Sequence, residues 1–79
     1  ADRSAENVVE DMLIKEIIDK FLDVLSSDER KIFVRRYWYL SPVKEIAKEY
    51  GFSESKVTVS LFRTREKLKK VLEKEGVML

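Results

Sequence analysis

The segment 41–65 contains two helix starts separated by one sharp break, and this arrangement constrains the fold more than any other feature. Ser41 is a typical N-cap residue, and Pro42 after it suits the first helical position, where a missing N–H costs nothing. Gly51 ends that helix because glycine accepts the left-handed backbone of a C-terminal cap. Ser53 then caps a second helix. Two helices joined by about three residues that include a glycine indicate a helix-turn-helix.

Apolar residues recur at helical spacing on both sides of this break. The first helix carries Val43, Ile46, Ala47 and Tyr50, and Val57 falls where the second helix should meet the first. The small side chain of Ala47 lets the second helix cross closely. An ordinary helical hairpin in a small bundle would have similar spacing, so these residues alone leave that alternative open.

The composition excludes several function classes. The 79 residues include no cysteine and no histidine, so disulfides, thiolate metal sites and a Cys or His nucleophile–base pair are ruled out. No stretch resembles a signal peptide, and no apolar run approaches the ~20 residues of a membrane span. We therefore expect a cytoplasmic, non-enzymatic domain over residues 1–79, without cofactor, metal or membrane contact.

Charge is distributed unevenly along the chain. Residues 1–29 contain nine acids and three bases, whereas residues 30–79 contain thirteen bases and six acids. A basic half that coincides with a helix-turn-helix suggests a nucleic-acid surface. The alternative, that these charges only keep a helical protein in solution, explains their number but not their segregation.

The remaining pattern predicts an all-α, four-helix domain without a wing. The expected helices cover residues 5–25, 27–39, 42–50 and 54–75, with a leading amphipathic helix in 1–25 and a helix-turn-helix core in 26–79. The apolar half of the first helix contains Leu13, Ile14, Ile17, Ile18, Phe21, Leu22, Val24 and Leu25. Three apolar residues lie outside this stripe, either as incidental surface residues or as contacts to another domain or copy: Val8, Val9 and Met12.

Ser26 and Glu29 form a capping-box pattern that should start the second helix. In this helix Ile32, Phe33 and Tyr37 are expected to face the core. Trp38 and Leu40 could face either way, and an exposed ring there would suit a partner contact.

The last helix has one apolar and one polar face. The apolar face contains Val57, Leu61, Thr64, Leu68, Val71 and Leu72; the polar face contains Ser55, Lys56, Val59, Phe62, Arg63, Glu66 and Lys70. Recognition helices present their N-terminal residues to base edges in the major groove. Lys56 would donate to guanine, and Val59 or the Thr58 methyl would touch a thymine methyl. Glu54 would either accept from a cytosine amine or serve only the helix dipole.

Phosphate contacts are expected beside this reading surface. Arg63 lies one turn beyond Val59 and should reach a phosphate. Ser41, Lys44 and the first amides of the helix at Pro42 would form a second phosphate contact across the groove. A dimer contact would also explain an exposed Val59 beside Phe62.

Together these residues resemble region 4 of bacterial RNA polymerase sigma factors, nearest to the small extracytoplasmic-function-like branch. The resemblance extends from about Leu25 to Leu72. Its most specific part is the succession Glu45-Ile46-Ala47, Gly51-Phe52-Ser53, Val57, Leu61 and Arg63. It also includes Glu29-Arg30, Ile32-Phe33, Arg36-Tyr37 and Arg65-Glu66-Lys67-Leu68.

The resemblance implies promoter recognition during transcription initiation. Residues that would read the minus-thirty-five element and its backbone are Ser53, Glu54, Ser55, Lys56, Thr58 and Val59, with Arg63 on the backbone. Residues that would dock on the flap of the RNA polymerase beta subunit are Phe21, Leu25, Ile32, Phe33, Arg36 and Tyr37. Anti-sigma proteins often compete for the latter surface in this family.

The chain also departs from the family pattern. Region 2 is missing, so the chain is either a fragment or a stand-alone region-4-like protein. Thr58-Val59-Ser60 replaces a frequent Lys-Ser-Arg, and Ser26 replaces a frequent proline. With fewer basic positions, we expect weak binding with steep salt dependence. Two alternatives remain: a protein-interaction module that no longer reads DNA, and a response-regulator effector domain, which would be dimeric.

Overall fold

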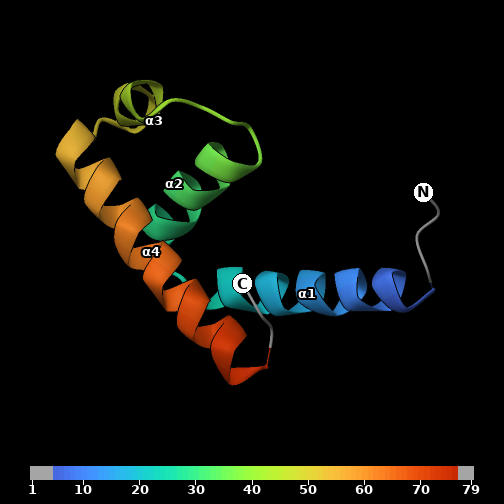
Figure 1. The fold of residues 1–79 in the computed structure, drawn as a ribbon. Helices are drawn as coiled ribbons and strands as arrows, with labels where there is room; N and C mark the ends of the chain where they lie inside the picture. The colour runs from blue at the N-terminus through green and yellow to red at the C-terminus, as the bar shows by residue number, and fades with distance from the viewer. Residues whose placement is uncertain (1–4, 77–79) are drawn as a thin grey trace.

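Four helices account for most of the backbone. The computed structural model describes the backbone of residues 5–76 and the side chains of residues 11–76. The helices are α1 (Ala5–Val24), α2 (Ser27–Tyr37), α3 (Val43–Tyr50) and α4 (Glu54–Lys74), and this part of the chain contains no strand (Figure 1). The all-α, four-helix prediction is confirmed, and each observed boundary lies within two residues of the expected one. The expected side-chain positions of Val8 and Val9 fall outside the described residues.

The corner between α1 and α2 is held by a capping box and one arginine. The Glu29 N–H donates to Ser26 Oγ, and the Ser26 N–H donates to Glu29 Oε1, both at 3.2 Å. The guanidinium of Arg30 donates to the carbonyl oxygens of Leu22 (3.0 Å), Leu25 (3.4 Å) and Asp23 (3.5 Å). The Leu22 carbonyl also accepts the Leu25 N–H (3.3 Å), and carbonyls at the end of a helix lack further partners within it, so Arg30 acts as a C-terminal cap of α1.

The connection between α2 and α3 differs from the prediction at both of its ends. Helix α2 ends at Tyr37 rather than 39, and Leu40 adopts a left-handed φ of 55°, which no α-helix accommodates. The N-cap of α3 is Pro42, not Ser41, and no side chain caps this helix. The Ser41 N–H instead donates to the Arg35 carbonyl (3.0 Å), so Ser41 belongs to the end of the previous helix.

The turn between α3 and α4 forms as predicted from Gly51, which ends α3 with a left-handed backbone. Gly51 has φ 71°, and the Phe52 N–H donates to the Ala47 carbonyl at 2.9 Å, as in a Schellman motif. Ser53 then caps α4 by accepting the Lys56 N–H at 3.0 Å. The direction of α4 is therefore fixed by local hydrogen bonds before any tertiary packing is considered.

One buried cluster joins the helix-turn-helix to α2. It consists of Ile32, Ile46, Ala47, Val57 and Leu61, with Val43, Tyr50 and Phe52 packed against it. Helix α4 packs against both α2 and α3, and Figure 1 shows it as the long diagonal below these two helices. The apolar face predicted for α4 is confirmed: Val57, Leu61, Thr64 and Leu72 are buried.

Aromatic packing extends the core from α2 towards α1. Phe21 and Phe33 meet edge to face with ring centroids 6.2 Å apart, and both residues are buried, as are Leu25 and Leu72. Tyr37 lies against Phe33 (4.7 Å) but is 40% exposed, so the expectation that it fills the core was wrong. It is the last residue of α2, at the end of the helix.

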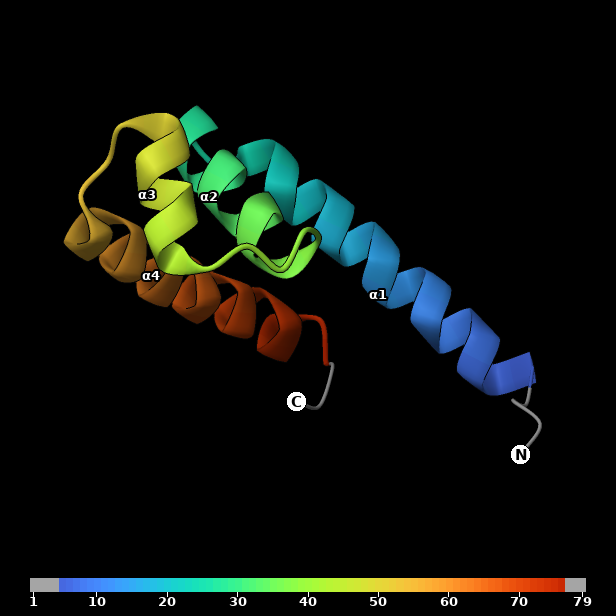
Figure 2. The ribbon, with the colours of Figure 1, turned by 90° about the horizontal axis from the view of Figure 1, so that it is seen from above.

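Among the described side chains of α1, the buried one, Phe21, lies in the C-terminal part of the helix. Phe21 and Leu25 are buried, whereas Leu13 and Val24 of the predicted apolar half are exposed, as is Met12. Figure 2 shows α1 running away from the other helices, so that its first turns lie beyond the end of α4. This direction accounts for exposure towards the start of α1 but not for that of Val24, the last residue of the helix.

Candidate nucleic-acid interface

The outward face of α4 carries a central stripe of four residues at helical spacing: Ser55, Val59, Phe62 and Glu66. The two middle residues are apolar and exposed: Val59 is 45% exposed and Phe62 is 59% exposed. Since Val57, Leu61 and Thr64 are buried on the opposite side, the stripe faces away from the core. This confirms the predicted orientation of α4.

Cationic residues lie along one edge of this stripe. At about 100° per residue, Lys56, Arg63, Lys67 and Lys70 fall on the same side of α4. All four are exposed. The edge therefore presents positive charge over the whole length of the helix, which suits a phosphate backbone running beside it.

Lys56, expected to read guanine, is engaged within the protein. Its Nζ lies 3.4 Å from Asp28 Oδ2 in the first turn of α2 and 3.9 Å from the ring centroid of Phe52. Both charged side chains remain about half exposed, at 50% and 52%. An exposed pair of this kind is weak, so DNA can compete for the lysine.

The neighbouring acid, Glu29, engages a second lysine of the same edge. Lys67 Nζ donates to Glu29 Oε2 at 2.8 Å. This hydrogen bond, together with the N–H of Ser26, lowers the pKa of the Glu29 carboxyl below its usual value. The first turn of α2 thus offers two carboxylates to the basic edge of α4.

Sequence reasoning missed this acidic turn as part of the site. Glu29 was expected to take part in the capping box of α2, and local spacing explains it fully. The partners of Asp28 and Glu29, Lys56 and Lys67, are 28 and 38 residues away. The available signal was the eleven-residue interval between the two lysines, which places them on the same side of α4.

The other predicted DNA contacts lie on the surface but not in one cluster. Ser53, Glu54, Ser55, Thr58 and Arg63 are exposed around the first turns of α4. Lys44 is exposed in the first turn of α3, and Ser41 is half-buried just before it. The carbonyl of Ser41 accepts a hydrogen bond from Arg36 (3.2 Å), which tethers the connection to α2.

The six residues expected to contact polymerase divide into two groups. Phe21, Leu25, Ile32 and Phe33 are 6% exposed or less, so they can shape a surface only from beneath. Arg36 and Tyr37 are exposed. A hollow of about 360 Å³ lies beside Tyr37 and is lined by Ile18, Phe33, Tyr37 and Trp38.

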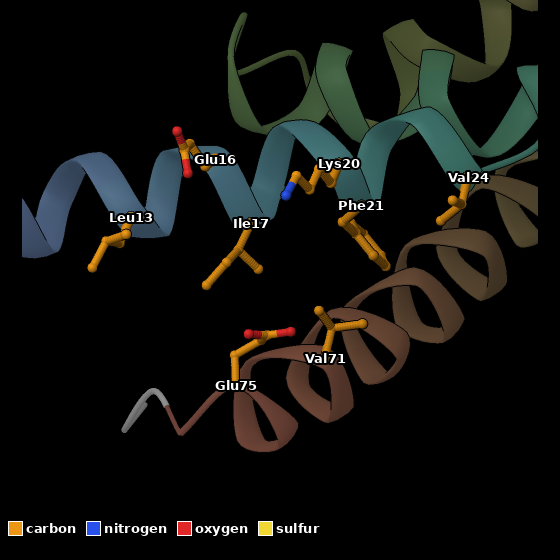
Figure 3. A pocket seen from close by; sticks show the side chains of 8 residues that line it. All are labelled: Leu13, Glu16, Ile17, Lys20, Phe21, Val24, Val71 and Glu75. Atoms are coloured by element: carbon orange, nitrogen blue, oxygen red, sulfur yellow. The ribbon is translucent and has the colours of Figure 1, made fainter.

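A second hollow lies between α1 and the end of α4. It measures about 440 Å³ and is lined mainly by apolar side chains, with Lys20 and two glutamates among the lining residues. Figure 3 shows Leu13 and Ile17 of α1 pointing towards α4, and Val71 pointing back. This groove is a consequence of the open angle between the two helices.

Two classes of site are not found among the residues that the structure describes. No group of three or more carboxylate side chains gathers closely enough to hold a metal ion there. None of the helices, so far as they are described, is both long and apolar enough to cross a bilayer.

The comparisons with known proteins agree with this geometry. No individual curated protein matches the chain. Residues 15–68, more than half of the chain, match the family model described as sigma-70, region 4. This stretch contains the acidic turn of α2, the whole of α3 and the reading face of α4. The chain therefore belongs to the sigma-70 region 4 family and is a helix-turn-helix, DNA-binding domain of a sigma factor, of the kind that interacts with DNA and RNA polymerase in transcription initiation.

Proposed function

We propose that the domain reads the minus-thirty-five promoter element in the major groove through the first turns of α4. The observation that carries the proposal is the exposed face of α4 around Val59, with the cationic edge that includes Arg63 beside it. Arg63 and the start of α3 at Lys44 would hold the two phosphate backbones, while Ser53, Glu54, Ser55 and Thr58 would border the base edges.

We also propose that the same domain docks on the beta flap of RNA polymerase through the surface where α1 meets α2. Tyr37 and Trp38 are 40% and 54% exposed beside the hollow lined by Ile18 and Phe33. Exposed aromatic rings beside an apolar hollow are typical of protein contacts. Arg36 lies next to them. An anti-sigma protein would compete for this surface, and both contacts would take place in the cytoplasm.

The DNA contact is tested by titrating short promoter duplexes at two salt concentrations. Arg63→Ala and Lys44→Ala should weaken binding to all sequences similarly and reduce the salt slope by about one each. The matched control is Lys20→Ala, an exposed lysine of α1 that is remote from the reading face. Equal losses for all three variants, or salt-independent binding, would contradict the proposal.

The polymerase contact is tested with Trp38→Ala and the control Tyr39→Ala. Tyr39 is also an exposed ring, but it lies over Arg35 instead of beside the hollow. Trp38→Ala should weaken binding to a purified flap fragment and leave DNA binding unchanged. A tight flap complex without any salt-dependent DNA binding would favour the alternative, a protein-interaction module of the same fold.

A further inference from the structure

The reading face of α4 has little capacity for hydrogen bonding to bases. Its central stripe offers one hydroxyl, on Ser55, then the exposed side chains of Val59 and Phe62, and then the acid Glu66. Arginine, lysine, asparagine and glutamine, which distinguish guanine and adenine through paired hydrogen bonds, are absent from these four positions. The centre of the stripe, formed by Val59 and Phe62, is therefore an apolar surface.

The nearest long donor is held to one side. Lys56 is bound between the Asp28 carboxylate (3.4 Å) and the Phe52 ring (3.9 Å), on the edge of α4 and not over the central stripe. Each of these two contacts favours the withdrawn position by a few-fold. In this position Lys56 neither reaches over Val59 nor competes with it for a base.

We infer that Val59 and Phe62 select DNA by contact with C5-methyl groups in the major groove, and that Asp28 supports this choice by withholding Lys56. Thymine is the only standard base that carries such a methyl group. The inference rests on the proposed DNA-reading function and specifies its substrate: an element with thymine methyls where the first turns of α4 enter the groove. The surface is continuous with the cationic edge of α4, which would hold the adjacent phosphates.

The experiment uses duplexes that differ only in the methyl group. In the first pair, one duplex alternates adenine with thymine and the other alternates adenine with uracil. In the second pair, one duplex alternates guanine with cytosine and the other alternates guanine with 5-methylcytosine. Loss of each contacted methyl should weaken binding about fourfold, as expected for one buried methylene, and methylation of cytosine should strengthen it by a similar factor. The two pairs change the methyl in opposite base contexts, so a shape effect of adenine–thymine sequence cannot imitate the result.

Variants assign the effect to residues. Val59→Ala with Phe62→Ala should abolish the difference between thymine and uracil duplexes, whereas Val24→Ala, at an even more exposed apolar side chain of α1, should retain it. Asp28→Asn should raise affinity for the guanine–cytosine duplexes a few-fold more than for the adenine–thymine duplexes, because the released Lys56 can donate to guanine. Asp19→Asn controls for the change in net charge.

The outcomes separate this inference from the proposed function. Salt-dependent binding that is equal for thymine and uracil duplexes overturns methyl reading but leaves DNA binding intact. A methyl effect that persists in the Val59–Phe62 double variant overturns the assignment to these residues. An Asp28→Asn variant that behaves like Asp19→Asn overturns the role given to Asp28. Absence of salt-dependent binding to every duplex contradicts the proposed function itself.

Discussion

Replacing Thr64 by valine should make the domain more stable. The Thr64 side chain is 0% exposed in the core-facing row of α4, and among the described side chains its Oγ1 is a buried polar atom without a hydrogen-bond partner. A buried hydroxyl without a partner costs about 1–3 kcal/mol. Valine keeps nearly the same shape and a similar helix propensity, so most of this cost should be recovered. We expect a gain of about 1 kcal/mol, which raises Tm by about 4–8 °C for a domain of this size.

The measurement is chemical and thermal unfolding followed by circular dichroism. Thr58→Val is the matched control, because it makes the same chemical change on the same helix at an exposed position. It should change the free energy of unfolding by no more than about 0.5 kcal/mol. If Thr64→Val is as stable as the wild type or less, the hydroxyl has a partner that the packing argument omits, and the reasoning is refuted.

Two further predictions concern the turn and the capping box. Gly51→Ala should lower the free energy of unfolding by about 1–2 kcal/mol, because the residue has a left-handed φ of 71°. Steric clash is not the cause, since an added Cβ meets nothing within 4 Å. Gly51→Asn should lower the free energy of unfolding by less in the same denaturant titration, and an equal loss would contradict this backbone explanation. Glu29 has a lowered pKa in the folded state, so its contribution to stability is present above the ordinary value of 4.5 and is lost as the pH falls through the folded pKa. Denaturant midpoints measured from neutral pH downwards should therefore fall less steeply below that value in Glu29→Gln than in the wild type, and parallel curves would argue against the role of the Lys67 and Ser26 contacts.

Local signals in the sequence were sufficient for most of the backbone. The capping box at Ser26, the glycine at Gly51 and the serine cap at Ser53 each act over three or four residues, and each forms as predicted. The buried face of α4 followed from periodicity alone, since a helix of 21 residues repeats its pattern many times. These features do not depend on how the helices are arranged.

The errors occurred where a residue's environment depends on residues outside its own helix. Ser41 was expected to cap α3, but its N–H closes the end of α2 because Leu40 turns the chain. Tyr37 looked like a core residue, yet it lies against Phe33 with 40% of its surface exposed. The engagement of Lys56 by Asp28 likewise requires the crossing of α2 and α4, which no local pattern specifies.

The candidate site was predictable in its orientation but not in its chemistry. Periodicity placed Val59 and Arg63 on the outward face, and the structure agrees. Periodicity also predicted that Lys56 contacts guanine, because a single helix does not reveal the ion pair of Lys56 with Asp28. Which of these residues contact DNA stays a prediction until the titrations are made.

The hydrogen bonds of Arg30 have a mechanical consequence for the whole molecule. One guanidinium joins the last carbonyls of α1 to the beginning of α2, and α1 extends from this corner for 20 residues. At 1.5 Å per residue the helix is about 30 Å long, so a rotation of about ten degrees at the corner would displace its far end by about 5 Å. A small rearrangement at this corner is thereby amplified into a large movement of α1, and the Arg30 hydrogen bonds and the Phe21–Phe33 contact together restrain it.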